Sequence, residues 1–136
     1  MAEIRGATGQ AVGEILQEAR SPEYHGLPHD TWYGFTNDSV AGSPVVLATY
    51  AASGFVPVLW GAGVLNTPSS GTMLVEVQVF TGGQWQTIKS VSMPIVEDSY
   101  ETGSLPESTI NSDMRMVVTP SVSGAQVGVL CDGVQL

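Results

Sequence analysis

The chain has 136 residues, a length that suits one domain, and 43% of them are hydrophobic, which is enough to build a core. Only 12% are charged, and four basic residues against thirteen acidic ones give a net charge of −9. This balance argues against partners that need clustered basic side chains, namely nucleic acid and anionic membrane surfaces. The single cysteine, Cys131, excludes an intrachain disulfide, and we expect it to be a small buried residue of the last strand.

Residues 8–21 form the one helix that the sequence predicts. Thr8 can cap its first turn, and Pro22 ends the helical pattern. Its apolar side chains fall on one stripe at helical spacing: Val12, Ile15, Leu16 and Ala19. A helix this short is marginal in isolation, so we expect it to lie on a surface.

Residues 22–43 are rich in turn signals and are predicted to be an irregular connector. The connector contains Trp32, Tyr33 and Phe35, and large aromatic side chains are enriched where proteins meet. We therefore divide the chain into an N-terminal arm, residues 1–43, and a β-domain, residues 44–136. The arm is expected to serve assembly, so that deleting residues 1–43 would leave a folded β-domain.

From residue 44 onward the sequence reads as strand after strand. The predicted strands are 45–51, 55–60, 72–80, 85–93, 113–119 and 124–131, with an acidic loop at 94–112. Pro57 requires an edge position or a bulge in its strand. Six or more closely spaced antiparallel strands predict a mainly β fold, an antiparallel β-sandwich of the jelly-roll or Ig-like kind.

The strongest local signal is the hairpin over residues 72–93, whose turn is Gly82-Gly83. Counting from this turn places Phe80 opposite Trp85 and Glu76 opposite Lys89. The predicted core face carries Met73, Val75, Val77, Val79 and Ile88. The other face carries the aromatic pair Phe80 and Trp85, which we expect to contact a second sheet or another subunit.

No pattern in the sequence predicts a catalytic centre or a cofactor site. His25 and His29 are four apart, but Gly26 and Pro28 between them prevent the helix that a zinc pair needs, so we expect loop histidines. The acidic segments 37–39 and 97–101 lack the alternation of a calcium loop and are interpreted as solvated loops. We expect no metal, no cofactor and no enzymatic activity.

Three tryptophans leave a second function open. Trp32, Trp60 and Trp85 could form a platform on which sugar rings stack, as in carbohydrate-binding modules, or they could serve core and interface packing. A glycan- or receptor-binding module is therefore the alternative function.

The hairpin 77–85, the strand 113–119 and the turn 123–127 together resemble small β-sandwich structural proteins of tailed-bacteriophage virions. The resemblance covers roughly residues 72–131 and implies a head-decoration or cement protein, a head-fibre base or a tail component, with no catalytic residues. It implies as partners the major capsid protein or other virion proteins, with homo-oligomers expected.

The expected location of the chain is the outer surface of a particle, because packaged DNA would repel a surface of charge −9. No apolar run near Met1 resembles a signal peptide, so we expect synthesis in the host cytoplasm without export. The candidate assembly residues are Val12, Ile15, Leu16, Trp32, Tyr33, Phe35, Phe80 and Trp85.

Overall fold

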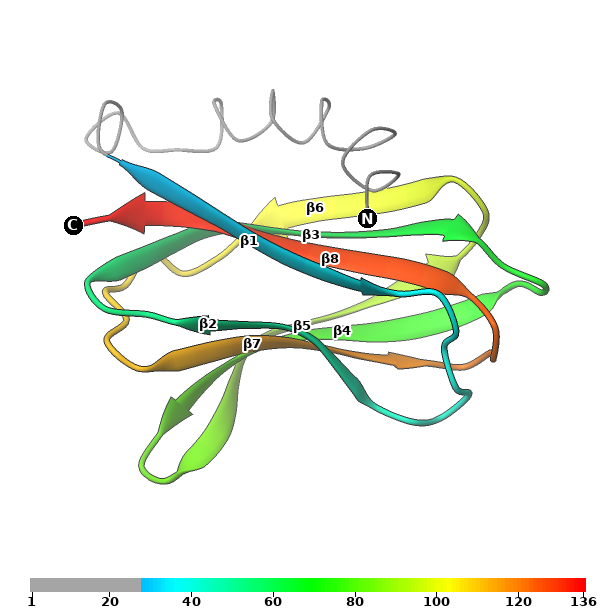
Figure 1. The fold of residues 1–136 in the computed structure, drawn as a ribbon, viewed down its shortest axis with the longest axis horizontal. Coiled ribbons are helices and arrows are strands. Elements are labelled where there is room, and N and C mark those ends of the chain that lie inside the picture. The colour runs from blue at the N-terminus through cyan, green and yellow to red at the C-terminus, as the bar shows by residue number, and fades with distance from the viewer. Residues whose placement is uncertain (1–27) are drawn as a thin grey trace.

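The computed structural model describes residues 28–136, which form eight antiparallel strands in two layers (Figure 1). In chain order the strands are β1 (His29–Thr36), β2 (Val45–Ala51), β3 (Phe55–Asn66), β4 (Gly71–Thr81), β5 (Gln84–Ile95), β6 (Ser99–Ser104), β7 (Asp113–Pro120) and β8 (Gln126–Gln135). No α-helix occurs within the described range, and the predicted helix with Val12, Ile15 and Leu16 lies outside it. Across 28–136 we find no helix with the length and apolarity to cross a membrane.

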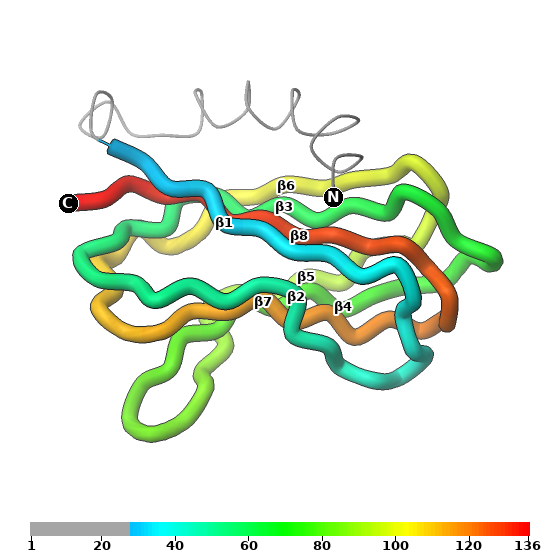
Figure 2. The backbone as a smooth tube through the Cα atoms, viewed as in Figure 1, coloured from blue at the N-terminus to red at the C-terminus, as the bar shows by residue number. Residues whose placement is uncertain are grey.

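One sheet has the order β1-β8-β3-β6 and the other has the order β2-β7-β4-β5. Consecutive strands from β1 to β4 alternate between the sheets, so the backbone crosses repeatedly from layer to layer (Figure 2). This strand order is that of an eight-stranded jelly roll, one of the two sandwich types that the sequence left open. The mainly β, sandwich prediction is confirmed.

The core lies between the two sheets and is built by alternating inward side chains. Trp32 of β1, Cys131 of β8 and Trp60 of β3 stand side by side in register on the inner face of the first sheet. The second sheet contributes alternating valines and methionines: Met73, Val75, Val77, Val79, Met93, Met114, Met116 and Val118. Cys131 is completely buried, in agreement with its predicted structural role.

The prediction of an irregular connector over residues 22–43 is wrong for residues 29–36, because these residues form β1. The strand pairs along its whole length with β8, so the sandwich begins at His29 and not at Pro44. Trp32 is 7% exposed, and its ring stacks on Tyr50 with centroids 5.5 Å apart. Deleting residues 1–43 would remove an edge strand and a core residue, so we no longer expect the remainder to fold.

The acidic loop predicted at residues 94–112 also contains a strand, β6, which pairs with β3. Its inward position opposite Trp60 is Gly103, where a Cβ atom would lie 2.6 Å from the indole Nε1 of Trp60. The tryptophan therefore fills the space that an inward side chain of β6 would occupy. This explains why β6 lacks the apolar alternation that marks a strand in the sequence.

The predicted hairpin is confirmed at its turn, where Gly82 and Gly83 have positive φ and Phe80 pairs with Trp85. The register shifts between Val77 and Gln78, so Glu76 lies opposite Ser90, and Lys89 lies opposite Val77. The predicted Glu76–Lys89 pairing is therefore wrong beyond the bulge. A bulge adds one residue to a strand, so the side chains that follow it point to the face opposite to the one that simple counting predicts. Pro57 does coincide with a register shift, as predicted, although β3 is a central strand.

Candidate functional site

The tip of the β4–β5 hairpin projects from the body of the sandwich (Figure 1) and forms the candidate site. Phe80, 40% exposed, meets the half-buried Trp85 edge to face, with ring centroids 5.2 Å apart. The guanidinium of Arg115, from β7, lies 4.2 Å from the centroid of the Trp85 ring. A cation over an indole face is a favourable contact that holds the ring in place. We call Phe80, Trp85 and Arg115 the tip cluster.

A line of hydrogen bonds on the outer face of the second sheet orients the tip cluster. Arg115 Nε donates to Gln78 Oε1 at 2.7 Å, and Gln78 Nε2 donates to Thr87 Oγ1 at 3.3 Å. Thr87 Oγ1 in turn donates to Glu76 Oε2 at 2.9 Å. The chain of hydrogen bonds begins at the positively charged guanidinium of Arg115 and ends at the carboxylate of Glu76. The two opposite charges polarise the bonds between them and so strengthen each bond. The bond from Arg115 to Gln78 helps to hold the guanidinium in its position over the Trp85 ring.

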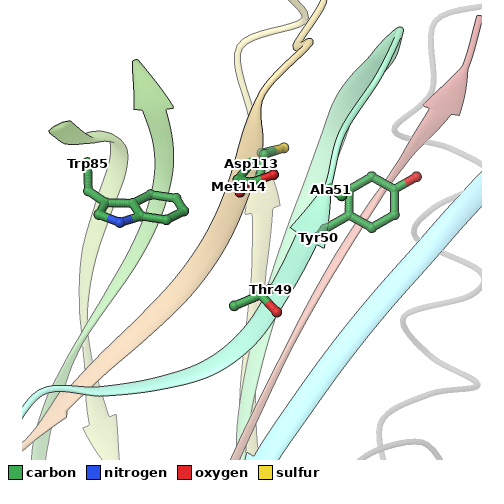
Figure 3. Close-up of a pocket in the computed structure, with 6 residues that line it drawn as sticks. All are labelled: Thr49, Tyr50, Ala51, Trp85, Asp113 and Met114. Carbon is green, nitrogen blue, oxygen red and sulfur yellow. The ribbon is translucent and has the colours of Figure 1, made fainter. Parts of the chain in front are cut away.

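A pocket of about 310 Å³ opens beside Trp85 on this face (Figure 3). The indole forms one wall, and β2 and β7 provide the other walls through Thr49, Tyr50, Ala51, Asp113 and Met114. Figure 3 shows the Trp85 ring reaching from the hairpin across the space toward β2. The pocket thus combines an aromatic ring, a hydroxyl and a carboxylate, groups suited to holding a small polar ligand.

The structure separates the predicted site residues into different places. Phe80 and Trp85 are brought together at the hairpin tip, as predicted. Tyr33 and Phe35, 43% and 41% exposed, lie on the outer face of the first sheet, while Trp32 beside Tyr33 points into the core. Trp60 is 3% exposed, so neither it nor Trp32 is available as a stacking platform, whereas Trp85 lines the pocket between the hairpin and β2.

Within residues 28–136, no group of three or more His, Cys, Asp or Glu side chains is placed to hold a metal ion. The candidate metal ligands of the sequence that lie in this range make other contacts. His25 lies outside the described residues. His29 Nδ1 lies 3.1 Å from Oδ1 of the buried Asp132. Ser39, in the segment weighed for calcium, is buried; its hydroxyl donates to the Val122 carbonyl and accepts from the Ala125 amide. Ser39 therefore joins its own loop to the loop between β7 and β8, and its side chain does not face solvent.

Two groups have perturbed acidity for reasons visible in the packing. Desolvation, together with a 2.6 Å hydrogen bond to Asp30, raises the pKa of the Tyr50 hydroxyl to about 12. Burial, and secondarily the neighbouring Asp132, raises the pKa of the Cys131 thiol well above its ordinary value. Both shifts favour the neutral form, so neither group is activated as a nucleophile.

Sequence reasoning missed Arg115, Gln78 and Asp113 as members of the site. The outward face of β7 could have been read from the alternation of Met114, Met116 and Val118, which places Asp113 and Arg115 opposite the core. That Arg115 reaches Trp85 depends on β7 pairing with β4, in which Gln78 lies opposite Arg115. The order of strands in the sheet is not encoded in a local pattern.

No family model matches the sequence, and no curated protein matches it. Among solved structures the fold is similar to that of PirA, with 14% identity over 82% of this chain and 94% of that chain, at a TM-score of 0.45. It is similar to a pilus protein of Bacillus endospore appendages, with 8% identity, coverage of 86% and 96%, and a TM-score of 0.48. It is also similar to the infectious bursal disease virus VP2 subviral particle, with 11% identity, coverage of 82% and 34%, and a TM-score of 0.49. These are likenesses of fold, and no functional argument rests on them.

Proposed function

We propose that the chain is a non-enzymatic structural protein of a virus particle, of the capsid decoration or cement type found in tailed bacteriophages, and that it binds the particle through the hairpin tip. The observation that carries this proposal is the tip cluster, an aromatic pair with an arginine on a hairpin that projects from the sandwich (Figure 1). Tryptophan and arginine are enriched among the residues that carry most of the energy of protein interfaces.

The pre-organisation of the tip cluster supports this role. The T-shaped contact with Phe80 and the guanidinium of Arg115 restrict the Trp85 ring before any partner arrives. A side chain that is already ordered loses less conformational entropy on binding, so more of its contact energy appears as affinity. The bulged hairpin projects from the sandwich (Figure 1), and Phe80, 40% exposed, lies close to its Gly82-Gly83 turn.

The charge supports a position on the outside of the particle. The chain carries −9, and packaged DNA would repel such a surface within a Debye length. The partner we propose is the major capsid protein or another virion protein, with synthesis in the host cytoplasm and no role for nucleic acid or membrane. Exposed Tyr33 and Phe35 offer a further apolar surface for contact within a homo-oligomer.

The experiment is co-sedimentation of purified chain with particles stripped of it. We expect wild type to sediment with the particles, and Phe80→Ser or Trp85→Ala to stay in the supernatant with an unchanged far-UV spectrum. The matched control is Val96→Ala, a side chain 49% exposed in the loop between β5 and β6. Binding that is lost equally in the control, or kept in both tip variants, would remove the hairpin tip from the interface.

A second candidate, a glycan-binding module, is favoured by the pocket beside Trp85. The indole can stack on the apolar face of a sugar, and Asp113 and Thr49 can accept or exchange hydrogen bonds with its hydroxyls (Figure 3). A glycan array separates the candidates. Specific binding that is lost in both Trp85→Ala and Asp113→Asn would favour glycan recognition, because Asp113 is no part of the tip cluster.

A further inference from the structure

The β4–β5 hairpin carries a second pocket on the face that turns away from the tip cluster. Val79 and Thr81 alternate with Phe80 along β4, so their side chains point to the opposite face of the hairpin. Between this face and the loop that leads into β7 lies a pocket of about 300 Å³. Its floor is aliphatic and consists of Val79, Ile88 and Ile110. We call the space above this floor the hairpin pocket.

The bulge in β5 places one side of the floor. The register shift lies between Val77 and Gln78, and it leaves Ile88 as the extra residue of β5, without a partner on β4. A bulge bends its strand, and the hairpin projects from the body of the sandwich (Figure 1). The side chain of Ile88 is half-buried and lines the space between the hairpin and the loop.

The opposite wall of the hairpin pocket is held in place by the start of β3. The Ile110 amide donates to the Phe55 carbonyl at 2.7 Å, and the Phe55 amide donates to the Ile110 carbonyl at 3.1 Å. Asn111 Oδ1 accepts a hydrogen bond from the Gly54 amide at 2.7 Å. The wall is therefore tied to the folded sandwich, and a preformed pocket loses less conformational entropy when it binds a ligand.

The lining of the hairpin pocket is uncharged, although the chain carries −9. Lys89 and Asp113 each follow a lining residue in the sequence, yet neither lines the pocket. The rim above the floor offers three hydroxyls and one amide, from Thr81, Thr109, Ser112 and Asn111. Within residues 28–136, the three hydroxyls and the Asn111 Nδ2 have no hydrogen-bond partner, so they are available to a ligand.

We infer that the hairpin pocket binds a peptide segment that places one uncharged aliphatic side chain on the floor, and that this segment belongs to the protein contacted by the tip cluster. The identity of that protein rests on the proposed function. Each peptide group of the segment offers one donor and one acceptor, which the hydroxyls and the amide of the rim can satisfy. A charged side chain would lose its water in this pocket without gaining a counter-charge. The partner thereby contacts both faces of the hairpin.

The first experiment measures the hairpin pocket without any particle. The probe is N-acetyl-leucine methylamide, one aliphatic side chain between two peptide groups, titrated into the isotope-labelled full-length chain and followed by NMR. We expect saturable shifts of the amide signals of Ile88 and residues 109–112, with the signal of Thr49, in the pocket beside Trp85, unchanged. The corresponding alanine probe should bind about tenfold more weakly because it buries fewer apolar groups, and the glutamate probe should cause no shifts.

Two variants test the floor and the rim separately. Ile88→Asp places a charge on the floor and should abolish the shifts caused by the leucine probe. Thr109→Val combined with Ser112→Ala removes two rim hydroxyls that bond to nothing else in residues 28–136, so this double variant should fold normally and bind the probe about fivefold more weakly. Thr49→Val, an equally exposed threonine on β2, is the matched control and should bind the probe as wild type does. A wild-type chain without saturable shifts, or shifts that persist in Ile88→Asp and in the double variant, would overturn the site.

The second experiment tests whether the segment belongs to the partner of the tip cluster. In co-sedimentation with stripped particles, the double variant keeps the tip cluster and should bind about fivefold more weakly than wild type, whereas Thr49→Val should not. Equal particle binding by wild type and the double variant would overturn the assignment of the segment to that partner. A wild-type chain that binds the leucine probe but not the particles would contradict the proposed function, and with it the partner, while supporting the peptide site.

Discussion

The placement of Trp32 in the core leads to a sharp prediction about β1, because neighbouring residues of this strand point to opposite faces. Trp32 is 7% exposed and stacks on Tyr50 at an interplanar angle of 2°, whereas Phe35 is 41% exposed on the outer face. Replacing a buried tryptophan by alanine costs about 3–5 kcal/mol of unfolding free energy. The indole Nε1 of Trp32 has no hydrogen-bond partner within 28–136, so no bond is lost and we expect about 3–4 kcal/mol.

Phe35→Ala is the matched control, and we expect it to cost about 1 kcal/mol because its ring is only partly removed from water. The assay is urea denaturation followed by circular dichroism, with the slope m compared between variants to confirm that the same surface unfolds. In thermal melts the Trp32→Ala loss corresponds to about 10–15 °C for a domain of this size. Equal losses in Trp32→Ala and Phe35→Ala would refute the assignment of β1 to the core.

Three further outcomes follow from the described residues. Cys131 is 0% exposed, and burial raises the pKa of its thiol, so the native protein should not react with a thiol reagent. The denatured chain should be labelled at once by the same reagent. Rapid labelling of the native protein at pH 8 would contradict the packing of Cys131. The pKa of Tyr50 is raised to about 12, so its contribution to stability should be complete below pH 10 and lost as the pH rises through 12. Tyr50→Phe should remove the last step of the phenolate absorbance titration. An unaltered titration would count against the hydrogen bond from Tyr50 to Asp30. Lys89 is half-buried opposite Val77 on the edge strand β5, where a charged side chain opposes the addition of a strand from another molecule. We therefore expect the Lys89→Val variant to self-associate in sedimentation velocity. A monodisperse variant would show that the edge is protected in another way.

The strands that could be predicted are those whose inward positions are apolar and whose outward positions are polar. The predicted strand 45–51 matches β2, and the hairpin strands match β4 and β5 to within two residues. β1 was missed because its inward positions include Gly34, where a Cβ atom would lie 1.6 Å from the Leu47 carbonyl oxygen. The close approach of β2 requires glycine there, while the larger Tyr33 and Phe35 face outward, so the usual alternation is reversed.

The site was predicted only in part, for a related reason. The pairing of Phe80 with Trp85 depends on a two-residue turn and could be counted from the sequence. The contact of Arg115 with Trp85 depends on β7 lying beside β4, and the facing of Lys89 depends on the bulge after Val77. Sheet order and bulges result from packing across the whole domain, and no local pattern encodes them.

The most direct measurement of the proposed function is electron microscopy of the intact particle at a resolution that places this chain. We expect its density on the outer surface, with the β4–β5 hairpin tip against a capsid or other virion protein and Phe80 and Trp85 buried in the contact. Density on the inner, DNA-facing wall, or an outer position with both side chains in solvent, would contradict the proposal.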